Sequence, residues 1–327
     1  MTAATAEQHR NALGAAGGKG VCPLCASDHV RTVQTIHSHA ICALLEDTVS
    51  LGLAEEFGDV ARLEYRHCDD CDLRFFFPAV TGSERFYQQL QRLESYYQEE
   101  KPEFAFARSQ LRPEHKVLEV GCGSGAFGIS LHTASYVGLE FSEQAASDAR
   151  RRGLEVLRES VEEHAQTHAA QYDAVCAFQV LEHVARPDQF LRACLAAIKP
   201  GGLVIVSVPS VDSFASGLPD FLLDMPPHHV TRWSDRCLRK VAELFSGELT
   251  ALWHEPLQPA HRRMHGQSAI LRRLYGWSGR SVPVVNETAG ERTVARIAWK
   301  VSALLAPVLR LFARRGISVT AVYRKSA

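Results

Sequence analysis

A short apolar strand that runs directly into three glycines constrains the fold of this chain more than any other segment. The apolar run begins at Lys116, and Gly121, Gly123 and Gly125 follow it at alternate positions. Glycine has no side chain, so the backbone can turn tightly there and a ligand can approach closely. A glycine turn alone is weak evidence, because such turns also end strands for structural reasons. Here a helix with free N–H groups is expected directly after the turn, and this order favours a ligand-binding loop.

Strands and helices are expected to alternate from Lys116 onward. The alternation predicts an α/β fold with a parallel sheet covered on both faces. A chain of 327 residues, with 46% hydrophobic and 22% charged residues, is a globular protein of one large domain or two smaller ones. Strands are expected near 116–120, 136–140, 155–157, 174–177, 203–209, 248–254 and 317–324, and helices near 126–132, 143–152, 161–169, 188–198 and 234–246.

The second expected strand ends in an acid, Glu140. A carboxylate at this position can accept hydrogen bonds from ribose hydroxyls, as in dinucleotide-binding folds. The alternative is a solvated carboxylate at the end of a strand. The glycine turn 15 residues earlier favours the ligand-binding interpretation.

Four stretches together resemble the class I S-adenosylmethionine-dependent methyltransferases, especially those similar to ubiquinone-biosynthesis methyltransferases. The resemblance covers most of 116–210 and implies an enzyme with a Rossmann-like, seven-stranded sheet that uses S-adenosyl-L-methionine. A dinucleotide-dependent dehydrogenase would explain the glycine turn but not the later stretches. The four stretches are VLEVGCGSG at 117–125, YVGLEFS at 136–142, YDAVCAFQVLEHVARPDQFL at 172–191 and LAAIKPGGLVIVSVPS at 195–210.

The same resemblance implies a role for each cofactor-binding residue. The glycine turn would pass under the cofactor, and residues after the second and third strands would surround the adenine. Only ten residues separate Gly125 from Tyr136, fewer than is usual in the family, so the first helix must be brief. The implied residues are Glu119 for the amino end of the methionine moiety, Gly121, Gly123 and Gly125 in the turn, Glu140 for the ribose, Phe141, Ser142, Ser160 and Val161 around the adenine, and Gln179 for the methionine portion.

Histidines near the expected carboxyl edge of the sheet are the candidate catalytic residues. His183 follows Glu182 just beyond the fourth strand, and His228 and His229 lie in a proline-stiffened loop that precedes Ser234, an expected helix N-cap. The ordinary pKa of histidine is near neutrality, so these side chains could act as bases toward an acceptor hydroxyl. Structural roles in the turn and the loop are the alternative. Similar PPHH-x-x-x-W segments occur in a subset of these methyltransferases, several of them linked to sugar or cell-surface glycan modification.

Two CxxC pairs near the N-terminus predict a zinc site. Cys22 with Cys25, and Cys68 with Cys71, can present four thiolates to one ion, and 42 residues between the pairs leave room for a folded unit. His37, His39 and Cys42 lie in that interval as substitutes. The unit is similar to modules that precede sugar C-methyltransferases. The chain therefore divides into a disordered tail (1–20), a zinc-binding module (21–80), a helical connector (81–115) and a methyltransferase domain (116–327).

A helical insertion, 255–316, is expected before the last strand. It holds eleven Lys and Arg against three acids, a net charge of +8 in a chain whose total is −1. Its segment 293–314 reads as an amphipathic helix, with Pro307 as a kink. A packed helix with a solvated basic face is one interpretation. The other is a platform for an anionic acceptor or an acidic membrane surface, with Arg262 and Arg263 contacting phosphate.

These features predict a cytoplasmic methyltransferase that modifies a sugar, a glycan or another small anionic acceptor. If 293–314 contacts lipid, the protein is peripheral at the inner membrane surface. The N-terminus has no secretory signal pattern, and no segment reaches the length of a membrane span. A protein or nucleic-acid methyltransferase is the alternative, although the acidic bias of 21–80 argues against nucleic-acid binding. A non-catalytic cofactor-binding scaffold is the third interpretation.

Overall fold

The computed structural model describes residues 20–49, 53–90, 99–305 and 315–326. The expected N-terminal tail, except Gly20, lies outside the described residues. So do Pro307, Arg310 and Arg314, which belong to the last part of the expected helix 293–314. Within the described residues, no helix combines the length and apolar character needed to cross a bilayer.

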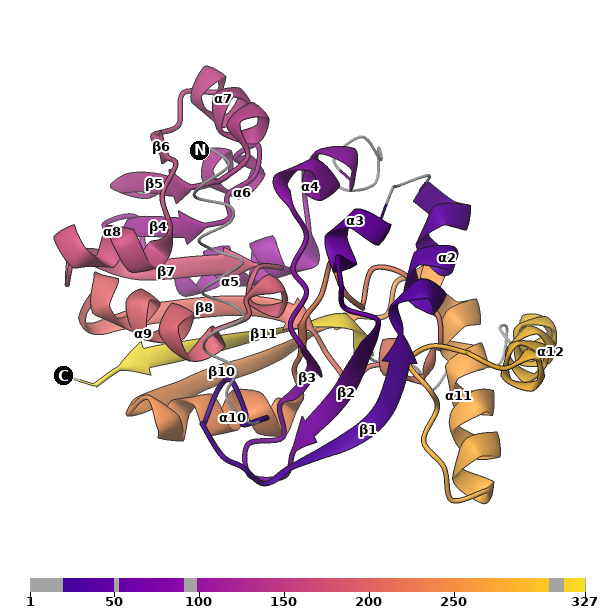
Figure 1. Cartoon of the computed structure of the whole chain (residues 1–327). Helices are drawn as coiled ribbons and strands as arrows, with labels where there is room; N and C mark the ends of the chain where they lie inside the picture. Colours follow the sequence, from indigo (N-terminus) through magenta and orange to yellow (C-terminus); the bar gives the residue numbers. More distant parts are fainter. Residues whose placement is uncertain (1–19, 50–52, 91–98, 306–314, 327) are drawn as a thin grey trace.

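Seven strands form the main sheet, in the order β10-β11-β8-β7-β4-β5-β6. Every pairing among β4 to β8 is parallel, and β11 is antiparallel to both of its neighbours. The expected α/β, Rossmann-like seven-stranded sheet is therefore confirmed (Figure 1). The strands are β4 (Lys116–Val120), β5 (Ser135–Leu139), β6 (Val156–Leu157), β7 (Tyr172–Phe178), β8 (Ile198–Pro209), β10 (Gly247–Pro256) and β11 (Arg315–Lys325).

Alternate residues of the central strands supply two separate cores. Leu118 of β4 and Val175 of β7 belong to one core with residues of the helices at 161–167, 187–197 and 235–244, whereas Val117 and Cys176 belong to the other. This is the period of two that a strand imposes on its side chains. The helices of the domain are α5 (Pro102–Gln110), α6 (Ala126–Ile129), α7 (Glu143–Arg151), α8 (Val161–Thr167), α9 (Pro187–Ala197) and α10 (Asp235–Leu244).

The helix that follows β4 is shorter than the range 126–132 expected from sequence. α6 ends at Ile129, and Gly128 packs so closely on Tyr136 that an added Cβ would lie 2.5 Å from the ring. A brief helix follows from the ten-residue connection, and the structure confirms that consequence.

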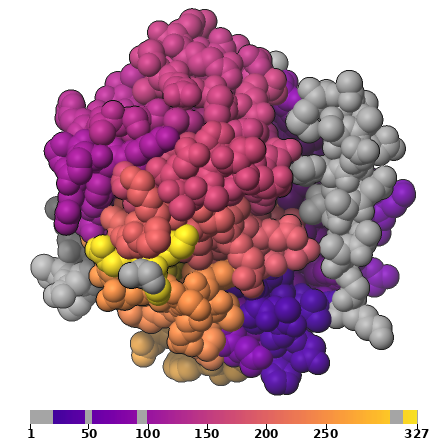
Figure 2. Space-filling view, turned by 90° about the vertical axis from the view of Figure 1, so that its left-hand side faces the viewer, coloured from indigo at the N-terminus to yellow at the C-terminus, as the bar shows by residue number. Residues whose placement is uncertain are grey.

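The N-terminal unit shares its sheet with the methyltransferase domain. Its strands form the order β1-β2-β3-β9, in which β9 (Thr231–Arg232) comes from the loop after β8. Met225, Val284 and Val285 also pack into its core, and Figure 2 shows its indigo surface directly against the orange part of the chain. Residues 21–80 therefore do not close a core by themselves. The elements are β1 (Val30–His37), α2 (Ser38–Val49), α3 (Ala54–Phe57), β2 (Arg62–Cys68) and β3 (Arg74–Phe77).

Helices also form the connector and the insertion, as expected. The insertion contributes a pair of helices between β10 and β11, which pack through Leu271, Tyr275 and Ala298. The remaining helical elements are α4 (Glu84–Leu90), η1 (Leu181–His183), η2 (Ala215–Gly217), η3 (Pro259–His261), α11 (Arg262–Trp277) and α12 (Ala289–Leu305).

Candidate functional site

The glycine turn and Glu140 form one hydrogen-bonded unit at the carboxyl end of β4 and β5. The Gly123 N–H donates to Glu140 Oε2 at 2.9 Å, and the Ser142 N–H donates to Oε1 at 2.7 Å. An ionised carboxylate has about four acceptor positions, so each oxygen keeps capacity for a ligand hydroxyl. The unit therefore combines a backbone that a ligand can approach closely with a carboxylate that can accept hydrogen bonds from ribose hydroxyls.

Glycine is required in this turn for conformation and for space. Gly121, Gly123 and Gly125 have φ of +71°, +53° and +82°, a region that other residues seldom adopt. A Cβ on Gly121 would lie 2.5 Å from a methyl carbon of Val180. The turn thus packs directly on the residue that follows Gln179 at the end of β7, and the two loops form one edge.

The residues predicted around the adenine occupy different environments. Phe141 is 57% exposed, so its ring is accessible to a ligand. The Ser142 and Ser160 hydroxyls instead cap α7 and α8, accepting from Ala145 N and Glu163 N. Val161, the first residue of α8, is buried in the core. Ser160 and Val161 therefore have structural roles that sequence reasoning did not assign.

The side chain of Glu119, in β4, is buried and accepts a hydrogen bond of 2.5 Å from the Tyr136 hydroxyl. Burial raises the pKa of Glu119 to about 8. Between the ordinary carboxyl pKa and about pH 8, Glu119 therefore keeps its proton in the folded chain but has lost it in the unfolded chain. Over this window, the free energy of unfolding falls as the pH rises.

Substitution Glu119→Gln is expected to remove this part of the pH dependence. The amide keeps the volume and the acceptor for Tyr136 but does not ionise. Each unit of pH costs the wild type about 1.4 kcal/mol through this one group. Denaturant unfolding at pH 5.5 and 7.5 should show the variant gaining stability relative to wild type on the order of 2 kcal/mol. Parallel pH profiles of the two proteins would contradict this expectation.

Gln179 adopts a left-handed backbone conformation, with φ of 56°. Its amide Nε2 lies 3.3 Å from Glu103 Oε1 and 3.3 Å from Ser318 Oγ. Non-glycine residues in this region cluster at functional sites, because the surroundings must hold them there. The Gln179 side chain therefore connects the end of β7 to α5 and to β11. It lies at the carboxyl edge of the sheet, where the sequence predicts the cofactor.

The three histidines predicted as catalytic come together, although His228 lies 45 positions after His183 in the sequence. Their ring centroids lie 4.5 Å apart for His183 and His228, 4.8 Å for His183 and His229, and 4.4 Å for His228 and His229. The Val230 N–H donates to Glu182 O, which fixes the histidine loop against η1. Tyr87 of α4 completes the cluster, with its hydroxyl 3.3 Å from His183 Nδ1.

Burial makes these histidines weaker bases than the sequence suggests. It lowers the pKa of His183 to about 4, and it lowers the pKa values of His228 and His229 well below the ordinary value. The near-neutral pKa assumed from sequence is therefore wrong for this cluster. Neutral imidazoles serve instead as hydrogen-bonding groups or as metal ligands.

Sequence reasoning missed several residues of the histidine cluster. Asp224 accepts from His229 Nδ1 at 3.1 Å and pairs with Arg232 at 3.1 Å, and all three side chains are buried. Asp224 could have been suspected as an acid between apolar residues and the two prolines. Tyr87 had no distinguishing signal among the many aromatic residues of 81–112.

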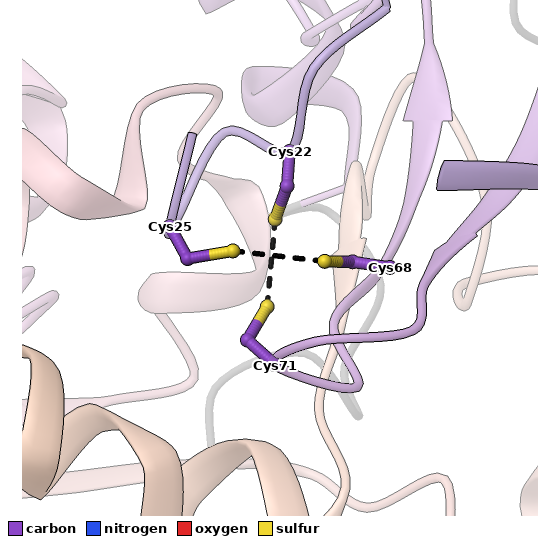
Figure 3. A group of neighbouring side chains, drawn as sticks. All are labelled: Cys22, Cys25, Cys68 and Cys71. Carbon is purple, nitrogen blue, oxygen red and sulfur yellow. Dashed lines mark hydrogen bonds between the residues drawn. The ribbon is translucent and has the colours of Figure 1, made fainter. Parts of the chain in front are cut away.

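The four predicted cysteine ligands meet at one point (Figure 3). All four sulfurs lie within 4.8 Å of one another, with Cys22 and Cys71 at 3.5 Å and Cys25 and Cys68 at 3.6 Å. A tetrahedron with Zn–S bonds of about 2.3 Å has edges of about 3.8 Å, so this donor set fits zinc. His37 lies elsewhere and contacts Glu287 at 3.0 Å.

The two arginines predicted to contact phosphate differ in their surroundings. The guanidinium of Arg263 lies 3.8 Å over the ring of Trp299 and donates to the Trp299 carbonyl oxygen. These contacts fasten α11 to α12, so Arg263 has a packing role. Among the described residues, Arg262 makes no such contact with Trp299.

A family model described as "Methyltransferase domain" matches residues 88–255. Ubiquinone biosynthesis O-methyltransferases of Escherichia coli O139:H28 and Escherichia fergusonii are each 41% identical over 100 residues. The match covers 28% of this chain and 42% of each relative, so the chain spans less than half the length of these curated relatives.

Solved structures with a related arrangement have low sequence identity. A SAM-dependent methyltransferase from Thermotoga maritima, described as a possible histamine N-methyltransferase, has a TM-score of 0.48 and 19% identity, covering 74% of this chain and 98% of that chain. A methyltransferase from Mesorhizobium loti has a TM-score of 0.45 and 13% identity, covering 68% and 97%.

Proposed function

Because this chain belongs to the methyltransferase-domain family that its residues 88–255 match, we propose that it transfers the methyl group of S-adenosylmethionine to a small acceptor. A lone pair of the acceptor attacks the methyl carbon, the carbon–sulfur bond breaks, and its electron pair stays on sulfur. The positively charged sulfur already activates the methyl group, so the protein contributes mainly by placing donor and acceptor in line.

The observation that carries this proposal is the hydrogen-bonded unit of Gly123 and Glu140 at the switch point of the sheet. Chain order reverses between β4 and β7, and ligands of such sheets bind outside the carboxyl ends at that point. The turn also packs on Val180, three residues before His183. A cofactor on the turn would therefore have the histidine cluster as its neighbour, and we place the acceptor there.

We propose a sugar, a glycan or another small anionic molecule as the acceptor. The 41% identity to ubiquinone biosynthesis O-methyltransferases supports a small molecule. The exposed apolar residues Leu274, Trp277 and Ile297, among the basic residues of α11 and α12, support contact with an anionic lipid-linked acceptor. Protein or nucleic-acid acceptors are the competing class. Incubation with methyl-labelled cofactor and separated small-molecule, protein and nucleic-acid fractions distinguishes these classes by which fraction gains label.

Cofactor binding depends on Glu140 in this proposal. Titration calorimetry of the intact chain should give a micromolar dissociation constant, about −8 kcal/mol. Glu140→Ala should weaken binding by about 1–3 kcal/mol, the scale of lost hydrogen bonds to a charged group. Glu143→Ala, which removes an exposed carboxylate three residues away, is the matched control and should leave affinity unchanged. Equal effects of the two substitutions would contradict the role of Glu140.

We propose zinc at the four-cysteine cluster, where it has a structural role. Four protein thiolates close the coordination shell, as in structural rather than catalytic zinc sites. The cluster contacts α10 through Cys237, a buried cysteine in the same core. Zinc would therefore hold the N-terminal unit against the helix that follows the histidine loop.

A further inference from the structure

We propose that His183, His228 and His229, together with Glu182, bind a divalent transition-metal ion, and that this ion holds an oxygen of the methyl acceptor. The role toward the acceptor rests on the proposed methyltransferase function, whereas metal binding does not. The site is separate from the four-cysteine cluster and has no thiolate ligand.

The three imidazoles converge closely enough to share one ion. One ring nitrogen of each lies within 4.8 Å of the corresponding nitrogen of the other two. They arise from two segments, η1 after β7 and the loop before β9, which the Val230–Glu182 hydrogen bond ties together. Histidines from two fixed segments make a preorganised set of donors.

In each of the three rings, the Nδ1 atom lies beside an oxygen that can accept a hydrogen bond. His183 Nδ1 is 2.6 Å from the His228 carbonyl oxygen, His228 Nδ1 is 2.8 Å from the Leu223 carbonyl oxygen, and His229 Nδ1 is 3.1 Å from Asp224 Oδ1. In the tautomer with the proton on Nδ1, each ring donates outward to this acceptor, and Nε2 keeps a lone pair. Metal-binding histidines use this arrangement, in which a carbonyl or carboxylate orients the ring.

Glu182 supplies a negative charge to the same point. Its side chain is 1% exposed, and its two oxygens have no hydrogen-bond partner among the described residues. Oε1 lies 3.9 Å from His183 Nε2 and 3.8 Å from His229 Nε2. A buried carboxylate without a donor is unfavourable in either protonation state, and a cation would satisfy it together with the imidazole lone pairs.

The donor set, three imidazoles and one carboxylate, suits a metal with nitrogen ligands. Metal–nitrogen bonds of about 2.1 Å give a tetrahedral edge of about 3.4 Å, so the Glu182 contacts need to close by about half an ångström. Imidazole donors favour ions such as Zn²⁺, Fe²⁺ or Ni²⁺, whereas Mg²⁺ and Ca²⁺ favour oxygen ligands. Such an ion could accept an acceptor oxygen as a further ligand and stabilise its deprotonated form.

Cobalt substitution tests the site on the full chain. Protein produced with Co²⁺ should bind two equivalents, one with the sulfur-to-cobalt charge-transfer bands of the cysteine cluster and one with visible d–d bands alone. The double substitution His228→Gln/His229→Gln should lose the second equivalent, with affinity reduced at least 100-fold. Its retained charge-transfer bands would show that it is folded. His164→Gln, a buried histidine outside the cluster, is the control and should keep both equivalents.

Glu182→Gln provides a second, isosteric variant, expected to weaken the second equivalent at least tenfold. Sodium azide should shift the visible d–d bands of the wild type if the ion has an open position, and unchanged bands would overturn the proposed contact with an acceptor oxygen. One equivalent of cobalt in the wild type, or two in the double variant, would overturn the metal site. Calorimetry with S-adenosylmethionine on the same wild-type sample separates this outcome from failure of the proposed function, because it measures cofactor binding independently of metal content.

Discussion

Loss of the zinc ion that we propose at the cluster of Cys22, Cys25, Cys68 and Cys71 is expected to destabilise the whole chain by several kcal/mol. Structural zinc sites contribute on the order of 10 kcal/mol in small domains, and part of this is lost when one ligand is removed. The effect should extend to the methyltransferase domain because the cysteines share a core with Trp233, Cys237 and Leu238. Cys68→Ser should therefore lower both zinc content and the melting temperature.

The connection between the cysteine cluster and α10 explains why the effect should spread. Asp72, next to Cys71, accepts a hydrogen bond from the hydroxyl of Ser234, which is the N-cap of α10. Cys42→Ser is the matched control, because Cys42 is a partly buried cysteine in α2 outside the cluster. Metal analysis and thermal unfolding of the two variants test the expectation. A Cys68→Ser protein with the zinc content and stability of the wild type would refute the assignment.

Substitution Arg232→Met is expected to lower the free energy of unfolding by about 3–5 kcal/mol, the scale for removing one partner of a buried ion pair. The Arg232 guanidinium pairs with the Asp224 carboxylate at 3.1 Å and lies over the rings of Tyr65 and Phe76. Both charged side chains are nearly inaccessible, so the variant would leave the carboxylate buried without its cation. Denaturant unfolding measures the loss.

Two further variants distinguish a buried charge from lost packing. Arg232→Met combined with Asp224→Asn should recover part of the stability, because the amide is neutral and still accepts from His229. Arg85→Met breaks an exposed pair with Glu55, whose side chains are 64% and 73% exposed, and should cost less than about 1 kcal/mol. If Arg232→Met and Arg85→Met had the same effect, the buried pair would have no special role.

The histidine cluster depends on this ion pair through Asp224. The carboxylate accepts from His229 and pairs with Arg232, and Arg232 lies in β9, the strand that joins the N-terminal sheet. The N-terminal unit therefore supports the candidate site through its sheet as well as through the cysteine cluster.

The sequence by itself determined the features that depend on neighbouring residues. Apolar runs and glycine turns identified strands β4 to β8, β10 and β11 and helices α6 to α10, because side-chain period and backbone conformation are local properties. The spacing of Cys22, Cys25, Cys68 and Cys71 indicated one site, because each CxxC turn presents two sulfurs together. The place of Glu140 at the end of a strand likewise predicted that its carboxylate could bind ribose hydroxyls.

Only the tertiary structure decided which distant segments meet, because burial and pairing depend on the whole fold. The sequence did not show that Thr231 and Arg232 join the N-terminal sheet, or that Tyr87 and Asp224 surround the histidines. It also could not show that His183 is desolvated, and desolvation lowers its pKa to about 4. A motif fixes the chemical type of a side chain, whereas its ionisation follows from what packs around it in three dimensions.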